Sequence, residues 1–525
     1  MSDVAHGATE KHGAAEKHGA TEKYGAAETY SAAEKHGATG RTHPAWVLIA
    51  TTLGAVDGID TAGVAVANPA IAKDLHTDLA ALQWITNGFL LAMAVCVLGA
   101  GRIGDRFGHK RAFLTGLVGF AVTSALVGTA RSVALLIALR VLQGAFGAVL
   151  MPSSLAILRL TFPRERLKTA LGIWAGLFSA ATAISPFIAG AIVNGLGWRW
   201  MFFLKVLLSA AAFVIGWWAI TVGRSATRPR TLDLPGILLL GAGLGSLIWA
   251  IMRIPVVGWA HPTVLLAAGL AVACLALFVF SASRSAEPLL PLEMFRSVPL
   301  SAATAVVLLM GMASFGTIFF LALYLQQVLG LSPLNTGVTL MAVTALFVVS
   351  APIGGLLNRR FGPRVPMLGG MVLNGAAMLA LSRVTTTSSV GSIWPLLLLF
   401  GFGLGFVMPT ATEVILSNAE EKRAGVAGGI QHTAGMLGTA LGTAVFGSVI
   451  SWRTAVDLSA ATSGTGVPAD TVGEAAAFTE GLRLVFLVGV GIAVLSMGLA
   501  LLTRRSGTGV APEETPLLDT APVEG

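Results

Sequence analysis

The chain has 525 residues, of which 55% are hydrophobic and only 11% are charged, and its formal net charge is +8. A water-soluble domain carries about 25% charged residues, so this composition excludes an ordinary soluble protein. The basic residues are spread over many short segments, which argues against a nucleic-acid-binding surface and for a membrane topology.

Apolar runs of a nearly constant length recur along the chain, separated by short polar or basic stretches. A run of about 20 residues crosses about 30 Å of hydrocarbon as an α-helix. The sequence therefore predicts an all-α integral membrane protein with 14 transmembrane helices, near residues 46–68, 82–101, 111–130, 133–157, 169–193, 200–222, 233–252, 263–283, 301–324, 336–357, 365–382, 392–416, 425–450 and 481–503.

The first 43 residues differ from the rest of the chain. They repeat a small, polar hexad of the type HGATEK, which cannot form a hydrophobic core. The repeat spaces His6, His12, His18 and His36 at multiples of six residues. Regular histidines can bind metal, but we interpret residues 1–43 as a disordered cytoplasmic tail and expect no metal site.

The loops between the predicted spans alternate in charge. Those that follow the even-numbered spans hold most of the loop arginines and lysines, for example Arg102, Arg106, Lys110 and Arg111 in the first of them. Basic loops face the cytoplasm. With an even number of spans, the rule places both termini in the cytoplasm of a multi-pass protein of the cell membrane.

Two segments of the chain are repeated. GRIGDRFGHKR (101–111) resembles GLLNRRFGPR (355–364), and GAVLMP (147–152) resembles GFVMP (405–409). Paired halves around a central site are typical of transporters. We predict two pseudo-symmetric six-helix bundles, residues 44–222 and 300–503, joined by two additional helices and a linker in residues 223–299, with a second cytoplasmic tail at 504–525.

No catalytic motif accompanies this architecture. The sequence contains no GxxxxGK[ST], HExxH or GxSxG pattern, and Cys96 and Cys274 both lie inside apolar runs. We therefore expect neither an enzyme nor a cofactor. A transporter without a nucleotide site has to draw its energy from an ion gradient, and we expect a proton gradient.

Ionisable residues inside predicted spans are costly in lipid and are therefore candidates for function. Asp57 and Asp60 lie three residues apart on one face of span one. One of them could take up and release the coupling proton, and the other could only bond a neighbouring helix. Arg140 lies in the middle of span four and needs a buried partner or a role in proton relay.

Three further polar residues lie in later spans. Glu413 follows Pro409 in span twelve and could be a second proton or cation site. His432 in span thirteen could titrate near neutral pH or be a satisfied core histidine. Lys205, near the start of span six, is expected to extend its ammonium group to the membrane interface.

The loop between spans two and three combines glycine with charge. Gly101 and Gly104 permit close helix contact, and Gly108 permits a tight turn. Asp105 could cap the following helix or pair with a basic group across the bundle. We interpret this loop as a conformational latch, formed by Gly101, Gly104, Asp105, Arg106, Gly108 and Arg111.

These motifs together resemble the major facilitator superfamily in its fourteen-span drug:proton antiporter branch, over residues 45–505. The resemblance is carried by GRIGDRFGHKR, LRVLQGAFGAVLMP (139–152), DGIDTAGVAVANP (57–69), LQWITNGFLLA (82–92) and WRWMFF (198–203). It implies that Asp60 is the membrane carboxylate of coupling and recognition, and that Arg140 is the proton-relay arginine.

The sequence departs from that branch at three places. The span-five motif GPxxGG of the branch is replaced by Ser185-Pro186 and Ala189-Gly190. Pro186 and Gly190 still predict a kink in span five, with altered packing where glycines are lost. The asparagines usual in the span-one motif and after WRWxF are Ala65 and Lys205, which suggests a shifted substrate range.

We therefore expect a proton-coupled exporter of hydrophobic drugs or antibiotics that works by alternating access. The acidic residues Asp57, Asp60 and Glu413 favour a cationic cargo. The alternative is a proton-coupled transporter of one metabolite, and an anionic metabolite would suit Lys205, His432 and Arg140. The expected partners are a small hydrophobic substrate, protons and the lipid bilayer, with no nucleic acid, and we expect a monomer.

Overall fold

A computed structural model describes residues 43–221, 233–285, 288–420, 423–465 and 471–503. The two predicted tails lie outside these ranges, apart from His43, and so do the histidines of the hexad repeat. The backbone of Asp57 is described but its side chain is not.

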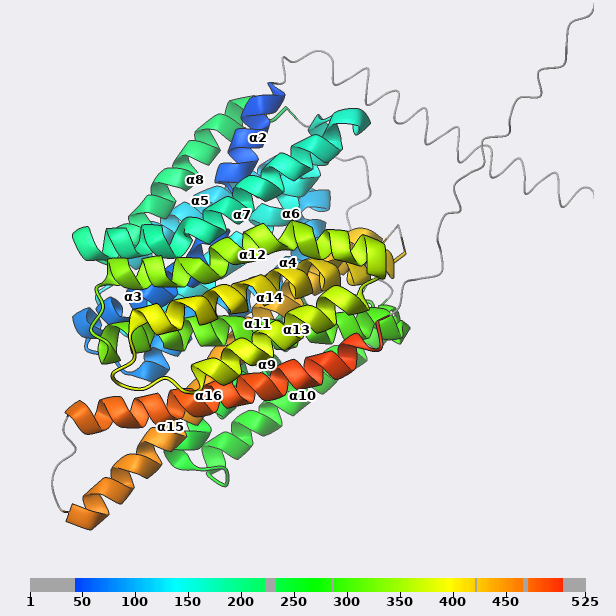
Figure 1. Cartoon of the computed structure of the whole chain (residues 1–525). Helices are drawn as coiled ribbons and strands as arrows, with labels where there is room; N and C mark the ends of the chain where they lie inside the picture. Colours follow the sequence, from blue (N-terminus) through cyan, green and yellow to red (C-terminus); the bar gives the residue numbers. More distant parts are fainter. Residues whose placement is uncertain (1–42, 222–232, 286–287, 421–422, 466–470, 504–525) are drawn as a thin grey trace, which may run out of the picture.

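Every regular element within the described ranges is helical (Figure 1). The helices are α2 (Pro44–Leu53), η2 (Val56–Ile59), α3 (Asp60–Leu75), α4 (Leu79–Phe107), α5 (His109–Thr129), α6 (Val133–Thr161), α7 (Arg164–Gly195), α8 (Arg199–Ala219), α9 (Leu234–Val257), α10 (Pro262–Arg284), η3 (Leu292–Arg296), α11 (Val298–Leu323), η4 (Tyr324–Val328), α12 (Pro333–Phe361), α13 (Arg364–Leu381), α14 (Val390–Ser417), α15 (Ala424–Thr465) and α16 (Thr471–Ala500).

Thirteen helices in the described ranges are long and apolar enough to cross a membrane. The remaining predicted span, the first, is not one helix: α2 ends at Leu53, a short turn of η2 follows, and α3 begins at Asp60. Together α2, η2 and α3 supply the fourteenth crossing. The predicted all-α membrane fold is confirmed, and the break in span one is the feature that hydropathy did not predict.

The internal repeat corresponds to a repeated turn. The residue directly after α4 is Gly108, whose φ is +90°, and the residue directly after α12 is Gly362, whose φ is +82°. Residues that have a Cβ atom rarely adopt these positive φ values, so both turns require glycine. The Phe-Gly pairs of the two repeated segments thus end one helix and start the next in the same way.

Several helix pairs join the N-terminal helices to the C-terminal ones, and two of them make the most extensive contact. α4 packs against α15, and α7 lies beside α12 (Figure 1). Hydrogen bonds cross both contacts. Gln83 Nε2 donates to the Thr443 carbonyl at 2.5 Å, Thr433 Oγ1 donates to the Ala94 carbonyl at 2.9 Å, and Thr344 Oγ1 donates to the Ala183 carbonyl at 2.6 Å.

The contact between α7 and α12 is close because each helix contributes a glycine. A Cβ on Gly190 would lie 2.4 Å from the Pro333 carbonyl oxygen, and a Cβ on Gly337 would lie 2.2 Å from the Pro186 carbonyl oxygen. The helices therefore pack closely at both Gly190 and Gly337, although the span-five motif has lost two of its glycines.

Ser185, the residue before Pro186, stabilises α7 beside that contact. Proline has no N–H, so Pro186 leaves the Thr182 carbonyl without its helical donor. Ser185 Oγ donates to this carbonyl at 3.0 Å. The serine that replaces a motif glycine thus satisfies the carbonyl that Pro186 leaves free, and α7 continues as a helix to Gly195.

The helices α9 and α10 pack against each other, and α9 also packs against α4 and α15. Ser448 Oγ on α15 donates to the Ile251 carbonyl on α9 at 2.7 Å. α10 leaves large apolar side chains such as Leu266 and Val272 exposed. The two additional helices therefore lie beside the α4–α15 contact, with α10 presenting an apolar surface suited to lipid.

Candidate functional site

The break in the first span places a carboxylate inside the protein. Asp60 is the first residue of α3, and none of its surface is exposed. A buried carboxylate in a membrane protein requires cationic or hydrogen-bonding partners. Asp60 has two such partners, which come from two other helices.

Arg140 of α6 is the first partner. Its Nη1 donates to Asp60 Oδ1 at 2.9 Å, and its Nη2 donates to Asp60 Oδ2 at 2.5 Å. This two-point geometry matches the planar guanidinium to the carboxylate. Arg140 is fully buried, as the sequence required of an arginine in the middle of a span.

Lys205 of α8 is the second partner. Its Nζ makes a short contact with Asp60 Oδ1, and only 1% of the residue is exposed. The interpretation of Lys205 as a lysine that reaches to the membrane interface was wrong. We call Asp60, Arg140 and Lys205 the charge cluster.

Uncharged groups fix Arg140 in place. Its Nε donates to the Ile85 carbonyl at 3.1 Å, and its Nη1 donates to Gln143 Oε1 at 2.6 Å. Gln143 Nε2 in turn donates to Ser124 Oγ at 2.6 Å. The guanidinium also lies 4.2 Å from the centroid of the Phe89 ring, a cation–π distance.

Lys205 has fewer anchors. Its ammonium group lies 4.4 Å from the centroid of the Phe202 ring, one turn earlier on α8. Its hydrogen bond within the described residues goes to Asp60. Among the described residues, the lysine therefore has only the carboxylate as a hydrogen-bond partner, whereas the arginine is also bonded to the Ile85 carbonyl and to Gln143.

Sequence analysis named Lys205 as a residue that would suit an anionic cargo, but it did not predict that the lysine is buried beside Asp60. A usable signal was present: α8 begins at Arg199, so Lys205 lies about 9 Å along the helix from its first residue. A lysine this deep on an apolar helix, at a position where the resembling branch has asparagine, indicates a buried partner rather than an interfacial position.

The other predicted site residues lie apart from the charge cluster. Glu413 is exposed and accepts a hydrogen bond from Asn358 Nδ2 at 2.6 Å. His432 is partly buried, and its Nε2 is buried without a hydrogen-bond partner among the described residues. Neither hydrogen bonds to the charge cluster, and the Asp57 side chain lies outside the described part of the chain.

The predicted latch forms a compact turn at the start of α5. Asp105 pairs with His109 one turn later, with 3.5 Å between Oδ1 and Nε2, so it contacts the following helix rather than a distant one. A Cβ on Gly104 would lie 2.3 Å from His109 Nδ1, which explains this glycine. Gly101 has open space around it, and Arg106 and Arg111 are exposed.

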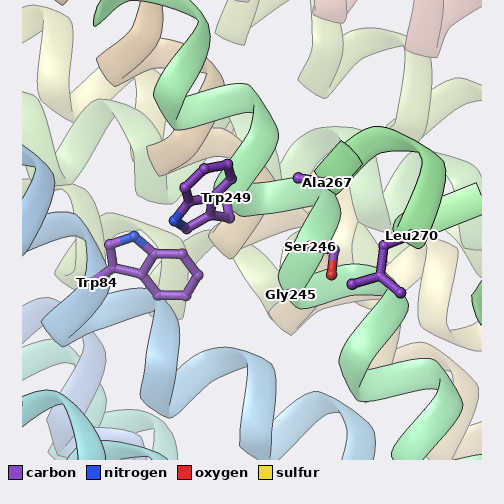
Figure 2. Close-up of a pocket in the computed structure, with 6 residues that line it drawn as sticks. All are labelled: Trp84, Gly245, Ser246, Trp249, Ala267 and Leu270. Atoms are coloured by element: carbon purple, nitrogen blue, oxygen red, sulfur yellow. The ribbon is translucent and has the colours of Figure 1, made fainter. Parts of the chain in front are cut away.

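A separate hollow of about 370 Å³ lies on the side of α4 where α9 and α10 pack (Figure 2). Trp84 of α4 and Trp249 of α9 both line it, and Ser246 lies on its α9 wall. No residue of the charge cluster lines this hollow. It is a groove of the additional helices and not part of the buried site.

Comparison with known proteins identifies the family. A family profile described as Major Facilitator Superfamily matches residues 50–443. The chain belongs to the Major Facilitator Superfamily. It is therefore a transporter and a multi-pass membrane protein, and it is not an enzyme.

Curated members of the superfamily that resemble this chain are resistance and export proteins. The chain is 41% identical over 515 residues to the tetracenomycin C resistance and export protein of Streptomyces glaucescens, covering 92% of this chain and 95% of that protein. It is 31% identical to the methylenomycin A resistance protein of Streptomyces coelicolor (75% and 82% covered). It is 30% identical to the multidrug efflux pump LfrA of Mycolicibacterium smegmatis (83% and 88% covered).

A solved superfamily fold agrees with this assignment. The crystal structure of a bacterial homologue of the human lysosomal transporter Spinster matches with a TM-score of 0.65, covering 89% of this chain and 98% of that one. The identity is 16%, so this likeness concerns the fold alone. The site chemistry has to come from the residues of this chain.

Proposed function

We propose that this transporter exports a hydrophobic antibiotic-like compound across the cytoplasmic membrane in exchange for protons. The observation that carries the proposal is the charge cluster, since three fully buried ionisable groups in membrane-spanning helices are too costly to serve packing alone. The names of the relatives support an antibiotic or drug as cargo.

Alternating access supplies the transport step. The tight contacts at Gly190 and Gly337 join α7 to α12 near the ends of these helices that the charge rule places outside. We infer that the described conformation is closed there. Rocking of the N-terminal helices against the C-terminal helices would open that end and expose the cargo to the outside.

The surroundings of the acidic residues bear on the charge of the cargo. From the sequence alone, Asp57, Asp60 and Glu413 favour a cationic cargo. Asp60 is already paired with two cations, and Glu413 is exposed and bonded to Asn358. We therefore propose a neutral or acidic hydrophobic cargo ahead of a cationic one, because the charge cluster has no carboxylate left for a cation.

The alternative proposal is a proton-coupled exporter of one metabolite. Lys205 favours it, since a buried second cation narrows the range of charges that the site can accept. The two proposals differ in one testable respect. A drug exporter transports structurally unrelated compounds, whereas the alternative exporter transports a single acidic metabolite.

A resistance assay tests both proposals. A hypersensitive bacterial host would express the wild type or Asp60→Asn and be challenged with tetracenomycin C, ethidium and unrelated neutral drugs. Export predicts resistance to tetracenomycin C that a protonophore abolishes and that Asp60→Asn lacks, with membrane levels of both proteins checked by immunoblot. Resistance to tetracenomycin C alone favours the single-metabolite exporter, and sensitivity to every compound would refute the efflux proposal.

A further inference from the structure

We infer that Lys205, rather than Asp60, is the group that releases and regains the coupling proton. The inference rests on the proposed proton exchange and concerns which residue performs it. It starts from the geometry of the charge cluster, in which one carboxylate faces two cations and all three groups are buried.

The charges of the cluster do not balance. When Asp60, Arg140 and Lys205 are all ionised, the cluster carries a net charge of +1. Among the described side chains, the groups that contact the cluster are uncharged: Phe89 on α4, Ser124 on α5, Gln143 on α6 and Phe202 on α8. A net charge in a low-dielectric interior is costly, so one proton is held less firmly than the others.

Arg140 cannot be the group that loses the proton. A guanidinium stays protonated in proteins. Four contacts also fix it in place: the two to Asp60, the one to the Ile85 carbonyl and the one to Gln143. Arg140 is therefore the permanent counter-ion of Asp60.

Proton uptake by Asp60 would worsen the imbalance. A protonated Asp60 would leave Arg140 and Lys205 as two neighbouring cations with a net charge of +2. It would also place a hydroxyl against the three N–H donors that point at its oxygens. The carboxylate is thus held ionised by its partners.

Proton loss from Lys205 has the opposite effect. The Nζ–H bond breaks, the proton passes to water when the cluster is exposed, and Nζ keeps the electron pair. The neutral amine retains two N–H groups, one of which can still donate to Asp60 Oδ1. The cluster then has no net charge, and the pair of Asp60 and Arg140 remains intact.

Cargo exchange follows from these two states. A neutral cargo, which is one of the two kinds proposed above, expels one proton if it binds the uncharged cluster more tightly than the charged one, and proton uptake restores the charged cluster. In the described conformation Lys205 is 1% exposed, so the proton stays on the lysine until the helices move. The residue that titrates is thus Lys205, at the position where the drug:proton antiporter branch has asparagine.

The test is cargo-driven proton movement in proteoliposomes that contain a trapped pH dye, with tetracenomycin C added outside. Lys205→Arg keeps a cation beside Asp60 but cannot release a proton. Lys205→Gln removes both charge and proton. Lys73→Arg, at an exposed position of α3, is the matched control. Cargo binding is measured in parallel by quenching of tryptophan fluorescence.

The inference predicts that Lys205→Gln, which is uncharged like the deprotonated lysine, binds cargo within three-fold of the wild type, and that Lys205→Arg, which stays charged, binds cargo more weakly. Both variants are expected to move protons at least ten-fold more slowly, while Lys73→Arg behaves as the wild type. Proton movement at half the wild-type rate or more in either Lys205 variant would overturn it, because Asp60 would then carry the proton. Loss of cargo binding in both variants would also overturn it, because Lys205 would be a cargo ligand. If the wild type itself moves no protons, the proposed exchange fails, and not only the choice of residue.

Discussion

The contact between α7 and α12 gives the sharpest conformational prediction. A methyl group at Gly337 would lie 2.2 Å from the Pro186 carbonyl oxygen and 2.9 Å from its carbonyl carbon. An ordinary contact is 3.4–4 Å, which is more than 1 Å longer than the distance to the oxygen, so Gly337→Ala has to push the helices apart. Overpacking of this kind costs about 1–3 kcal/mol, which corresponds to about a 5–150-fold shift in a two-state equilibrium.

The shift is directional, because the added methyl group clashes only where the two helices touch. We expect Gly337→Ala to depopulate the described conformation in favour of one in which these helix ends have separated. Gly355 lies on the same helix with open space around it, so Gly355→Ala is the matched control.

Spin-label distance measurements can detect this shift. Labels at Asn194 of α7 and Asn335 of α12 occupy exposed positions near the contact, after replacement of Cys96 and Cys274. Gly337→Ala is expected to move most of the distance distribution to longer values, and Gly355→Ala is expected to leave it unchanged. A Gly337→Ala distribution that matches the parent protein would refute the reasoning, since the close approach would then not be limiting.

Four further outcomes follow from single contacts. Arg140→Lys keeps the charge but loses the bonds to the Ile85 carbonyl and Gln143, so we expect a loss of about 2 kcal/mol in stability and at least a ten-fold slower export, measured by thermal unfolding and efflux. Gly108→Ala and Gly362→Ala place a side chain at positive φ and should each lower the free energy of unfolding by about 1–2 kcal/mol, whereas Gly172→Ala, inside a helix with open space around it, should not. Ser185→Ala leaves the Thr182 carbonyl unpaired and should cost about 1–3 kcal/mol, against little change for the exposed Ser283→Ala. Glu413→Gln should reduce export by less than two-fold, and a complete loss of export would restore Glu413 as a proton site.

Hydropathy predicted the spans well because each crossing needs a long apolar helix. It placed span five at 169–193, and α7 runs from Arg164 to Gly195. Hydropathy did not predict the features that depend on backbone geometry. The break between Leu53 and Asp60 contains no strongly polar run, so span one looked continuous at 46–68. Hydropathy also ended span thirteen at residue 450, whereas α15 continues as a helix to Thr465.

The site was predictable in part. A lone carboxylate in span one and a lone arginine in span four each require a buried partner, and the family resemblance implied a role for both. The sequence could not predict which of the buried charged side chains contact one another. Lys205 lies 145 residues from Asp60 along the chain, and only the folded arrangement of α3, α6 and α8 brings its ammonium group to the same carboxylate as Arg140. Gly337 could not be singled out from the sequence for the same reason, because the close contact that requires a glycine there is with a carbonyl of another helix.

The most direct test of the account is uptake of tetracenomycin C into proteoliposomes with an acidic lumen. Proton exchange predicts that the wild type concentrates the compound inside and that nigericin, which dissipates the pH gradient, releases it. Accumulation that is the same with and without the gradient would contradict proton-coupled export by this chain.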